Sequence, residues 1–441
     1  MKPTAHAPLL AGALVFLPMA LSGQAEPPAA SEPDTLRLGV LQAEALLADP
    51  RRQQRELHAR RTALRLRNLD AERLPAIAAE GQAQYQSDVV ELPLRSPTGA
   101  TPVPPNDTYD ARVVIDQTIL DPTVDPRREV VQAELAEAEA GVETVLYGLR
   151  AEVNQAFFAA ALLQERVREI HSVITDLEAR LREVSAYVTE GTALPGDAAA
   201  VEATLLERRQ DEELLLSERR SALAVLSELT NRDIDDDDVL VLPELEAAVA
   251  DARARLDELR ARPEYEGFGR ARERLARQED VVRAAELPRV GAYGHIGYGR
   301  PGLTLLGDDF DAYWLAGVQV RWTPWTWRSA SREREALRVQ QQIVAADEAA
   351  FSDALRRGVQ ADINAIERLA GTLATDDRII VLRERIEREA GLRLQEGALT
   401  AADYVERQSD VLEARLARAR HRVDLAHAQA RLLTTLGLEV R

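Results

Sequence analysis

The segment from Val142 to Val188, VETVLYGLRAEVNQAFFAAALLQERVREIHSVITDLEARLREVSAYV, decides the fold class of this chain. Its apolar residues recur at alternating steps of four and three, which is the spacing of a coiled-coil seam. No proline interrupts the chain from the residue after Pro126 to Glu190. A helix of that length extends roughly 100 Å at about 1.5 Å per residue. Because a rod so long cannot form a core alone, we expect it to pack along other helices.

A second proline-free segment of similar length runs from Arg328 to Glu396. Its apolar residues keep the same spacing, but Asp362 and Asp376 interrupt the pattern. We therefore predict a second long helix with a weaker apolar seam.

The two halves of the chain match each other at a constant offset of 206 residues, from Gly191 to Gly397 and from Asp197 to Asp403. The same offset relates Glu190, Leu206 and Glu207 to Glu396, Leu412 and Glu413. This self-similarity predicts two tandem repeats, which we place at residues 36–240 and 241–437. They join near the acidic run 235–238, and each contains a helical hairpin, at about 126–231 and 328–437.

Each half also contains two short segments in which apolar and polar residues alternate. These segments cover about residues 76–86 and 109–120 in the first half, and 289–299 and 313–324 in the second. In the first of them, Ile77 and Ala79 alternate with Glu80 and Gln82. Strict alternation is typical of strands with two different faces. The sequence therefore predicts a mainly helical chain that carries four such strands.

The first 25 residues have the features of a secretory signal peptide. Lys2 precedes an apolar run at residues 8–21, and small residues lead to Ala25, after which we expect cleavage. The run is shorter than the roughly 20 residues that an uncleaved membrane anchor requires. The sequence thus predicts export from the cytoplasm.

Charge and cysteine content exclude several classes of protein. The formal net charge of −19 argues against binding to nucleic acid or to anionic lipid surfaces. The chain has no cysteine, so it has neither disulfides nor a lipid-attachment cysteine after the signal peptide. Any membrane contact must therefore come from the fold.

Four strands are too few to close a barrel, and an open sheet edge cannot exist in hydrocarbon. If these strands enter a membrane, several chains must combine them. All four tryptophans lie within fourteen residues at the last strand and its exit, as an interfacial aromatic girdle requires. The alternative is a water-soluble β-domain with tryptophan in its core. The polar opposite faces of the strands favour the membrane interpretation. The tryptophans are Trp314, Trp322, Trp325 and Trp327.

Together these features resemble the TolC-like outer-membrane factors. The resemblance rests on the tandem halves, on Leu-Pro before a strand at Leu74 and Leu287, and on the glycine turns. It also rests on the strand exits 117–121 and 322–325, although Pro324 has no counterpart in the first half. The resemblance implies a homotrimer with a twelve-stranded β-barrel in the outer membrane and a long α-helical coiled-coil barrel in the periplasm.

The resemblance also implies a function and partners. It implies a passive exit duct of a tripartite efflux pump or a type I secretion system, which contacts a periplasmic adaptor protein and an inner-membrane pump. The hairpin tips would form the periplasmic mouth, with Asp197, Asp403 and Glu406 as acidic residues of a closed aperture. Adaptor docking would involve the tip residues Gly191, Thr192, Gly397, Ala398, Leu399 and Thr400.

Local sequence gives Asp403 a second interpretation. Thr400 to Asp403 has the pattern of a helix cap, in which a carboxylate stabilises the first turn. The aperture and cap interpretations are compatible, and the sequence leaves both open.

The sequence does not predict an enzyme, a metal site or a cofactor. The six histidines are scattered, and the glycines between residues 291 and 302 are not followed by the Gly-Lys-Ser/Thr of a phosphate loop. The alternative function is a soluble periplasmic coiled-coil adaptor or scaffold.

Overall fold

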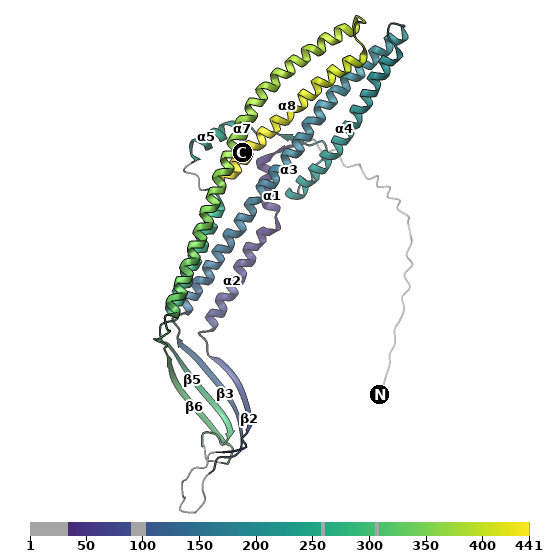
Figure 1. The fold of residues 1–441 in the computed structure, drawn as a ribbon. Helices are drawn as coiled ribbons and strands as arrows, with labels where there is room; N and C mark the ends of the chain where they lie inside the picture. The colour runs from purple at the N-terminus through teal and green to yellow at the C-terminus, as the bar shows by residue number, and fades with distance from the viewer. Residues whose placement is uncertain (1–33, 90–102, 257–260, 305–307, 441) are drawn as a thin grey trace, which may run out of the picture.

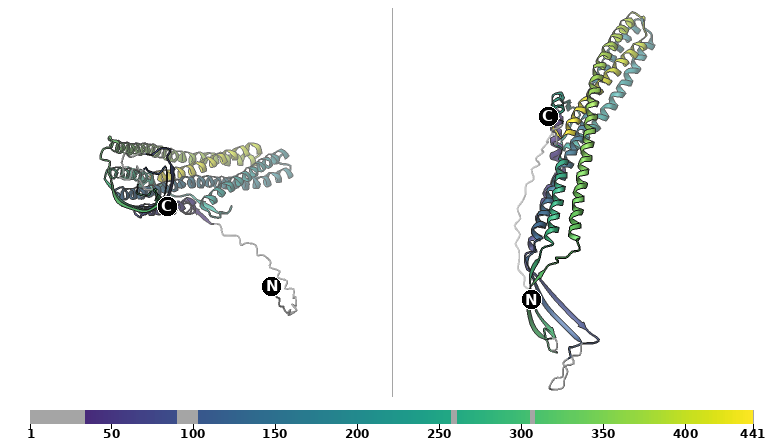
Figure 2. Two further views of the ribbon diagram at one scale, coloured as in Figure 1. Left: turned by 90° about the horizontal axis from the view of Figure 1, so that it is seen from below. Right: turned by 60° about the vertical axis from the view of Figure 1, so that its left-hand side comes forward.

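A computed structural model describes residues 34–89, 103–256, 261–304 and 308–440. The predicted signal peptide at residues 1–25 lies outside the described residues. The molecule is an elongated rod of helices with a curved β-sheet at one end (Figure 1). Two further views show the helices side by side along the rod and the strands continuing from its end (Figure 2).

Two helices run most of the length of the rod, α3 (Val124–Thr189) and α7 (Ser329–Gln395). Beyond its middle, α4 (Pro195–Thr230) returns along α3, and α8 (Ala401–Leu436) returns along α7. Near the sheet, α2 (Gln53–Ala71) and α6 (Pro263–Ala284) occupy the corresponding places beside α3. The shorter helices α1 (Leu38–Ala48), η1 (Pro50–Arg52) and α5 (Glu246–Ala254) lie near the middle of the rod (Figure 1).

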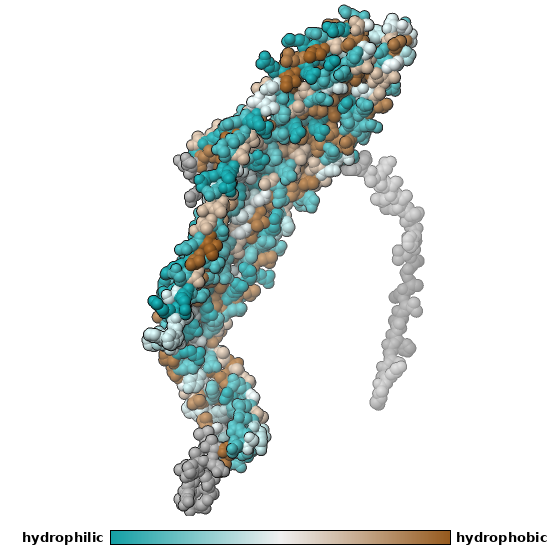
Figure 3. Space-filling view, in the orientation of Figure 1, coloured by the Kyte–Doolittle hydropathy of each residue, from teal (hydrophilic) through white to brown (hydrophobic). Residues whose placement is uncertain are grey.

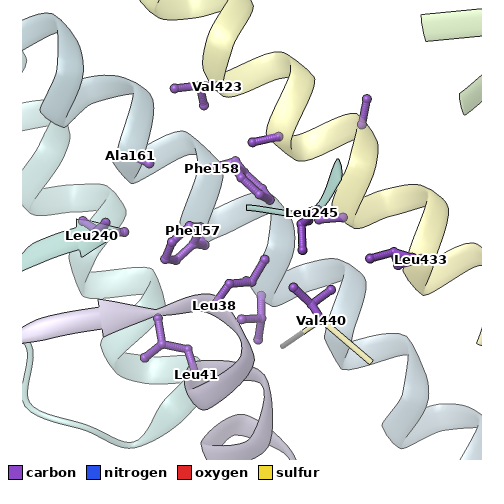
Figure 4. Packing of buried hydrophobic residues seen from close by; sticks show 14 of the residues in the cluster. Leu38, Leu41, Phe157, Phe158, Ala161, Leu240, Leu245, Val423, Leu433 and Val440 are labelled. Atoms are coloured by element: carbon purple, nitrogen blue, oxygen red, sulfur yellow. The ribbon is translucent and has the colours of Figure 1, made fainter. Parts of the chain in front are cut away.

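The predicted seam is the buried stripe of α3. Leu146, Val153 and Leu177 are at most 4% exposed. The buried stripe is wider than a two-residue seam, because Phe157 and Phe158 beside it are also buried. They pack against residues from the chain start, the middle and the C-terminal end (Figure 4). Burial of this wide stripe against several helices supplies the main apolar stabilisation of the rod.

The two aspartates that interrupt the second seam are buried, and each pairs with α8. Asp362 accepts a hydrogen bond from Arg431 Nε at 2.6 Å, and Asp376 lies 2.6 Å from Nδ1 of His421. Buried carboxylates of this kind need such partners. The interruptions therefore form polar links between α7 and α8.

The predicted strands form one antiparallel sheet in the order β2-β3-β5-β6. Their bounds are Ala76–Tyr85, Asp107–Leu120, Arg289–Arg300 and Asp311–Arg321. The prediction that the last strand continues to residue 324 is wrong, because β6 ends at Arg321. Pro324, which has no N–H for a ladder, lies in the connection to α7. The β3–β5 pairing joins the two halves of the chain and leaves β2 and β6 as edge strands.

The sequence did not predict a small parallel sheet near the middle of the rod. It pairs β1 (Thr35–Arg37) with β4 (Val239–Val241). The acidic run before β4 stabilises it: Asp238 Oδ1 accepts a hydrogen bond from Asp34 N at 2.8 Å, and the Asp238 carbonyl accepts one from Arg219 at 2.6 Å. The junction between the two halves is therefore an ordered part of the fold.

Candidate functional site

The sheet has one polar face and one face that is uncharged except at its far end, which we call the uncharged face. Directly paired residues of an antiparallel sheet share a face, and the register aligns Ile77, Ile115, Gly294 and Ala316. Ile77 and Val318 on this face are 71% and 67% exposed. No helix of the described residues packs over the sheet. The uncharged face comprises Ile77, Ala79, Gly81, Ala83, Tyr85, Tyr109, Ala111, Val113, Ile115, Gln117, Val290, Ala292, Gly294, Ile296, Tyr298, Ala312, Trp314, Ala316, Val318 and Val320. Among the paired residues of this face, the charged ones are Asp107 and Arg300, which form an ion pair of 2.8 Å at the end of the sheet farther from the helices.

The opposite face carries charged and amide side chains. Arg112 forms an ion pair with Glu80 at 2.7 Å, between β3 and β2. On the same face Tyr313 donates a hydrogen bond to Asp110 Oδ1 at 2.5 Å, and Gln319 lies opposite Gly291. This face is suited to water and the other to hydrocarbon.

Aromatic rings gather on the uncharged face at the end of the sheet that is farther from the helices. Phe310 stacks on Tyr109 and Tyr298, with ring centroids 6.1 and 5.6 Å away. Trp314 lies near this end and is 74% exposed. These rings form a belt at one border of the uncharged face, which we call the distal belt.

The other three tryptophans lie beyond the strand, at the end nearer to the helices. Trp322 follows the last residue of β6 and donates Nε1 to the Glu286 carbonyl at 3.1 Å. Trp325 and Trp327 meet edge to face, with ring centroids 5.9 Å apart. The four tryptophans thus divide between the two borders of the uncharged face.

The tips of the two hairpins have the same backbone structure. Gly191 and Gly397 have φ angles of 77° and 69°, which glycine adopts without strain. The next residues, Thr192 and Ala398, each donate a backbone hydrogen bond of 2.8 Å to the carbonyl five residues earlier. Both long helices therefore end in a Schellman motif, and the chain reverses into the next helix.

Asp197 connects the two tips. Its Oδ2 accepts a hydrogen bond from Leu194 N at 3.1 Å, within its own hairpin. Its Oδ1 accepts one from Ala401 N at 3.2 Å, at the start of α8. A carboxylate stabilises the positive end of a helix. Asp197 thus stabilises the start of both returning helices and holds the tips together.

The structure confirms the cap interpretation of Asp403. Thr400 is the N-cap of α8: its Oγ1 accepts a hydrogen bond from Asp403 N at 3.1 Å and donates one to Asp403 Oδ2 at 2.7 Å. Asp403 and Glu406 are both exposed in the single chain and lie three residues apart on α8. They therefore share a helix face.

A groove of about 710 Å³ separates the two tips. All six residues that we assigned to adaptor docking line it, together with Asp197 and Asp403. The structure therefore brings these residues to one place, but Glu406 is not among those that line the groove.

Comparison with solved structures identifies the fold. The outer membrane channel MtrE of Neisseria gonorrhoeae, in its open state, superposes with a TM-score of 0.63 at 20% identity, covering 92% of this chain and 90% of that one. The outer membrane protein VceC of Vibrio cholerae gives 0.64 at 15% identity, with 92% and 97% covered. CusC, whose structures concern transmembrane channel formation, gives 0.66 at 14% identity, with 91% and 92% covered. This chain has the outer-membrane channel fold.

At these identities the likeness concerns the fold alone, and it confirms the mainly helical chain with a few strands. No protein-family model matches the sequence, and no curated protein matches it. Among the described helices, none combines the length and apolarity that crossing a membrane requires.

Sequence reasoning missed one polar cluster, whose residue Arg180 also lines the groove. The Arg180 guanidinium lies 4.5 Å from the ring centre of Tyr404, whose hydroxyl is 3.4 Å from Glu387 Oε1. Burial raises the pKa of Tyr404 against the opposing effect of Arg180, and burial also raises the pKa of Glu387. These residues come from α3, α8 and α7, so no local sequence pattern could predict the cluster.

Proposed function

We propose that this protein is a subunit of an outer-membrane channel in which three copies close one twelve-stranded β-barrel. The observation that carries this proposal is the sheet, whose uncharged face is uncovered and whose two edge strands are unpaired within the described residues. Hydrocarbon tolerates a sheet only when every edge is paired. Additional copies provide those partners.

The required width of the lumen favours three copies. Two copies would give eight strands, and side chains fill the interior of an eight-stranded barrel. Three copies give twelve strands. This is the smallest closed barrel, built from four strands per copy, that has room for a water-filled path. The helices fit the same arrangement, because α2 and α4 lie at one border of the helical layer and α7 at the other.

The polar face of the sheet would line the lumen, and the uncharged face would contact lipid. Trp314 would lie in the outer aromatic girdle, and Trp322, Trp325 and Trp327 in the periplasmic one. The predicted signal peptide supports export, and the helical rod is suited to extend through the periplasm.

We further propose that the duct is passive, not an enzyme, and that it serves a tripartite efflux pump or a type I secretion system. The tip groove would dock a periplasmic adaptor, and that adaptor would connect the duct to an inner-membrane pump. Threefold symmetry would gather Asp403 and Glu406 of three copies around one axis, with Asp197 nearby. Six or more carboxylates at the narrow end would form a cation-binding aperture.

The alternative, a soluble periplasmic adaptor or scaffold, is disfavoured. A soluble domain must cover its apolar surface, whereas Ile296, Trp314 and Val320 are 63%, 74% and 67% exposed in the chain. On the side of the rod seen in Figure 3, hydrophobic side chains are scattered among hydrophilic ones and form no large continuous apolar patch that could cover the sheet.

Thiol accessibility tests the proposal, because the chain has no native cysteine. Gln319→Cys lies on the polar face of β6, and its neighbour Val320→Cys lies on the uncharged face. In planar bilayers, a bulky membrane-impermeant thiol reagent should reduce the conductance of Gln319→Cys channels and leave Val320→Cys channels unchanged. Absence of any conductance from the unaltered protein, or equal block of both variants, would refute the proposal.

A further inference from the structure

Two tyrosines on the polar face of the sheet lie over glycines of the neighbouring strand. The register pairs Tyr293 of β5 with Gly317 of β6, and Tyr313 of β6 with Gly297 of β5. A Cβ added at Gly297 would lie 2.6 Å from Tyr313 Cζ, and one added at Gly317 would lie 2.6 Å from Tyr293 Cζ. Both rings therefore occupy the space that any other residue would need for its side chain.

The Tyr313 hydroxyl shows how far its ring lies along the sheet. It donates a hydrogen bond to Asp110 Oδ1 at 2.5 Å, and a Cβ added at Gly299 of β5 would lie 2.9 Å from the same oxygen, so the two side chains meet over β5. Side chains in strands normally stand roughly perpendicular to the sheet. Tyr313 instead lies parallel to the sheet. One side of its ring faces Gly297, and the other side faces away from the sheet on its polar face.

Glycines on the uncharged face do not have this role. A Cβ at Gly294 would meet nothing closer than the Leu315 carbonyl, at 3.8 Å, and one at Gly81 would meet nothing within 4 Å. Backbone φ angles do not require Gly297 or Gly317 either, since neither is positive. Close approach of a ring is the physical reason for glycine at these two positions.

We propose that Gly297 and Gly317 set the bore of the channel, because they hold Tyr313 and Tyr293 flat against the lumen wall. This inference rests on the proposed function, in which the polar face lines the lumen. In three copies, six tyrosine rings would then lie against the wall. Without the glycines, these rings would project into the water-filled path. The glycine-rich sequence of β5 would thus serve passage of cargo, in addition to strand packing.

Single-channel conductance of the purified full chain in planar bilayers tests this inference. Gly297→Ala should push the Tyr313 ring into the lumen and cause a loss of conductance per channel. Gly294→Ala is the matched control, with the same substitution on the other face of the same strand, and should conduct like the unaltered protein. Adding Tyr313→Ala to Gly297→Ala should restore the conductance.

Equal conductance of Gly297→Ala and the unaltered protein would overturn the inference and leave the channel function intact. No conductance from the unaltered protein would instead refute the proposed function. If Gly297→Ala fails to assemble, Tyr313→Ala alone decides. Removal of a flat ring should leave conductance nearly unchanged, whereas a large rise would mean that the ring projects into the lumen.

Discussion

Val318→Arg tests the orientation of the sheet at the middle of the membrane. Val318 lies on the uncharged face, opposite Ala292, and is 67% exposed in the chain. It is four residues from Trp314 and four from Trp322. At about 3.4 Å per residue and about 40° of strand tilt, each tryptophan lies roughly 10 Å away along the membrane normal. Val318 is therefore near the bilayer midplane.

An arginine at this depth on the lipid side costs about 2 to 4 kcal/mol per chain. With a tenfold change for each 1.4 kcal/mol, assembly should weaken roughly 30- to 700-fold per chain. The same substitution at the next residue, Gln319→Arg, serves as the control. Gln319 is on the polar face opposite Gly291, where a guanidinium would remain in water.

The assay is the amount of each variant in the outer-membrane fraction, measured by immunoblot against the unaltered protein. We expect Val318→Arg to be nearly absent from that fraction and Gln319→Arg to be close to normal. Equal amounts of the two variants would refute this register of β6 in the membrane. Loss of Gln319→Arg with retention of Val318→Arg would reverse the assigned faces.

Three further predictions concern the helical rod. Replacing Asp403 and Glu406 by alanine should alter divalent-cation block of the reconstituted channel with little loss of assembly, whereas unchanged block would leave Asp403 only its role in the cap. Phe157→Ala should lower the free energy of unfolding by about 3 to 5 kcal/mol, because the ring is fully buried; thermal melts measure this, and a loss below 1 kcal/mol would contradict it. Burial lowers the pKa of His427 from its ordinary value of 6.5, so the neutral form contributes stability that is lost as pH falls below that value. His427→Phe should reduce this loss in melts above and below pH 6.5, and an unchanged pH dependence would be the contrary result.

Much of the fold could be predicted because its signals are local. Alternation between Ile77 and Gln82 gives a strand without knowledge of its partner, and the four-three spacing from Val142 gives a helix. The turns were also local, since Gly191 and Gly397 need no distant residue to adopt a positive φ.

The missed features all depend on pairing between distant segments. The three-residue strands at Thr35 and Val239 are too short to show alternation, and their pairing joins residues about 200 apart. Arg180 reaches Tyr404 only because α3 and α8 pack together. Similarly, the reason for Gly297 became visible only from the register that places Tyr313 over it.

The number of copies in the membrane is the central claim, and native mass spectrometry measures it most directly. Chemical cross-linking through amines is unsuitable, because Lys2 is the only lysine and lies in the predicted signal peptide. Protein purified from outer membranes in mild detergent should have three times the mass of the denatured chain. A particle with the mass of one chain that stays in solution without detergent would contradict the account.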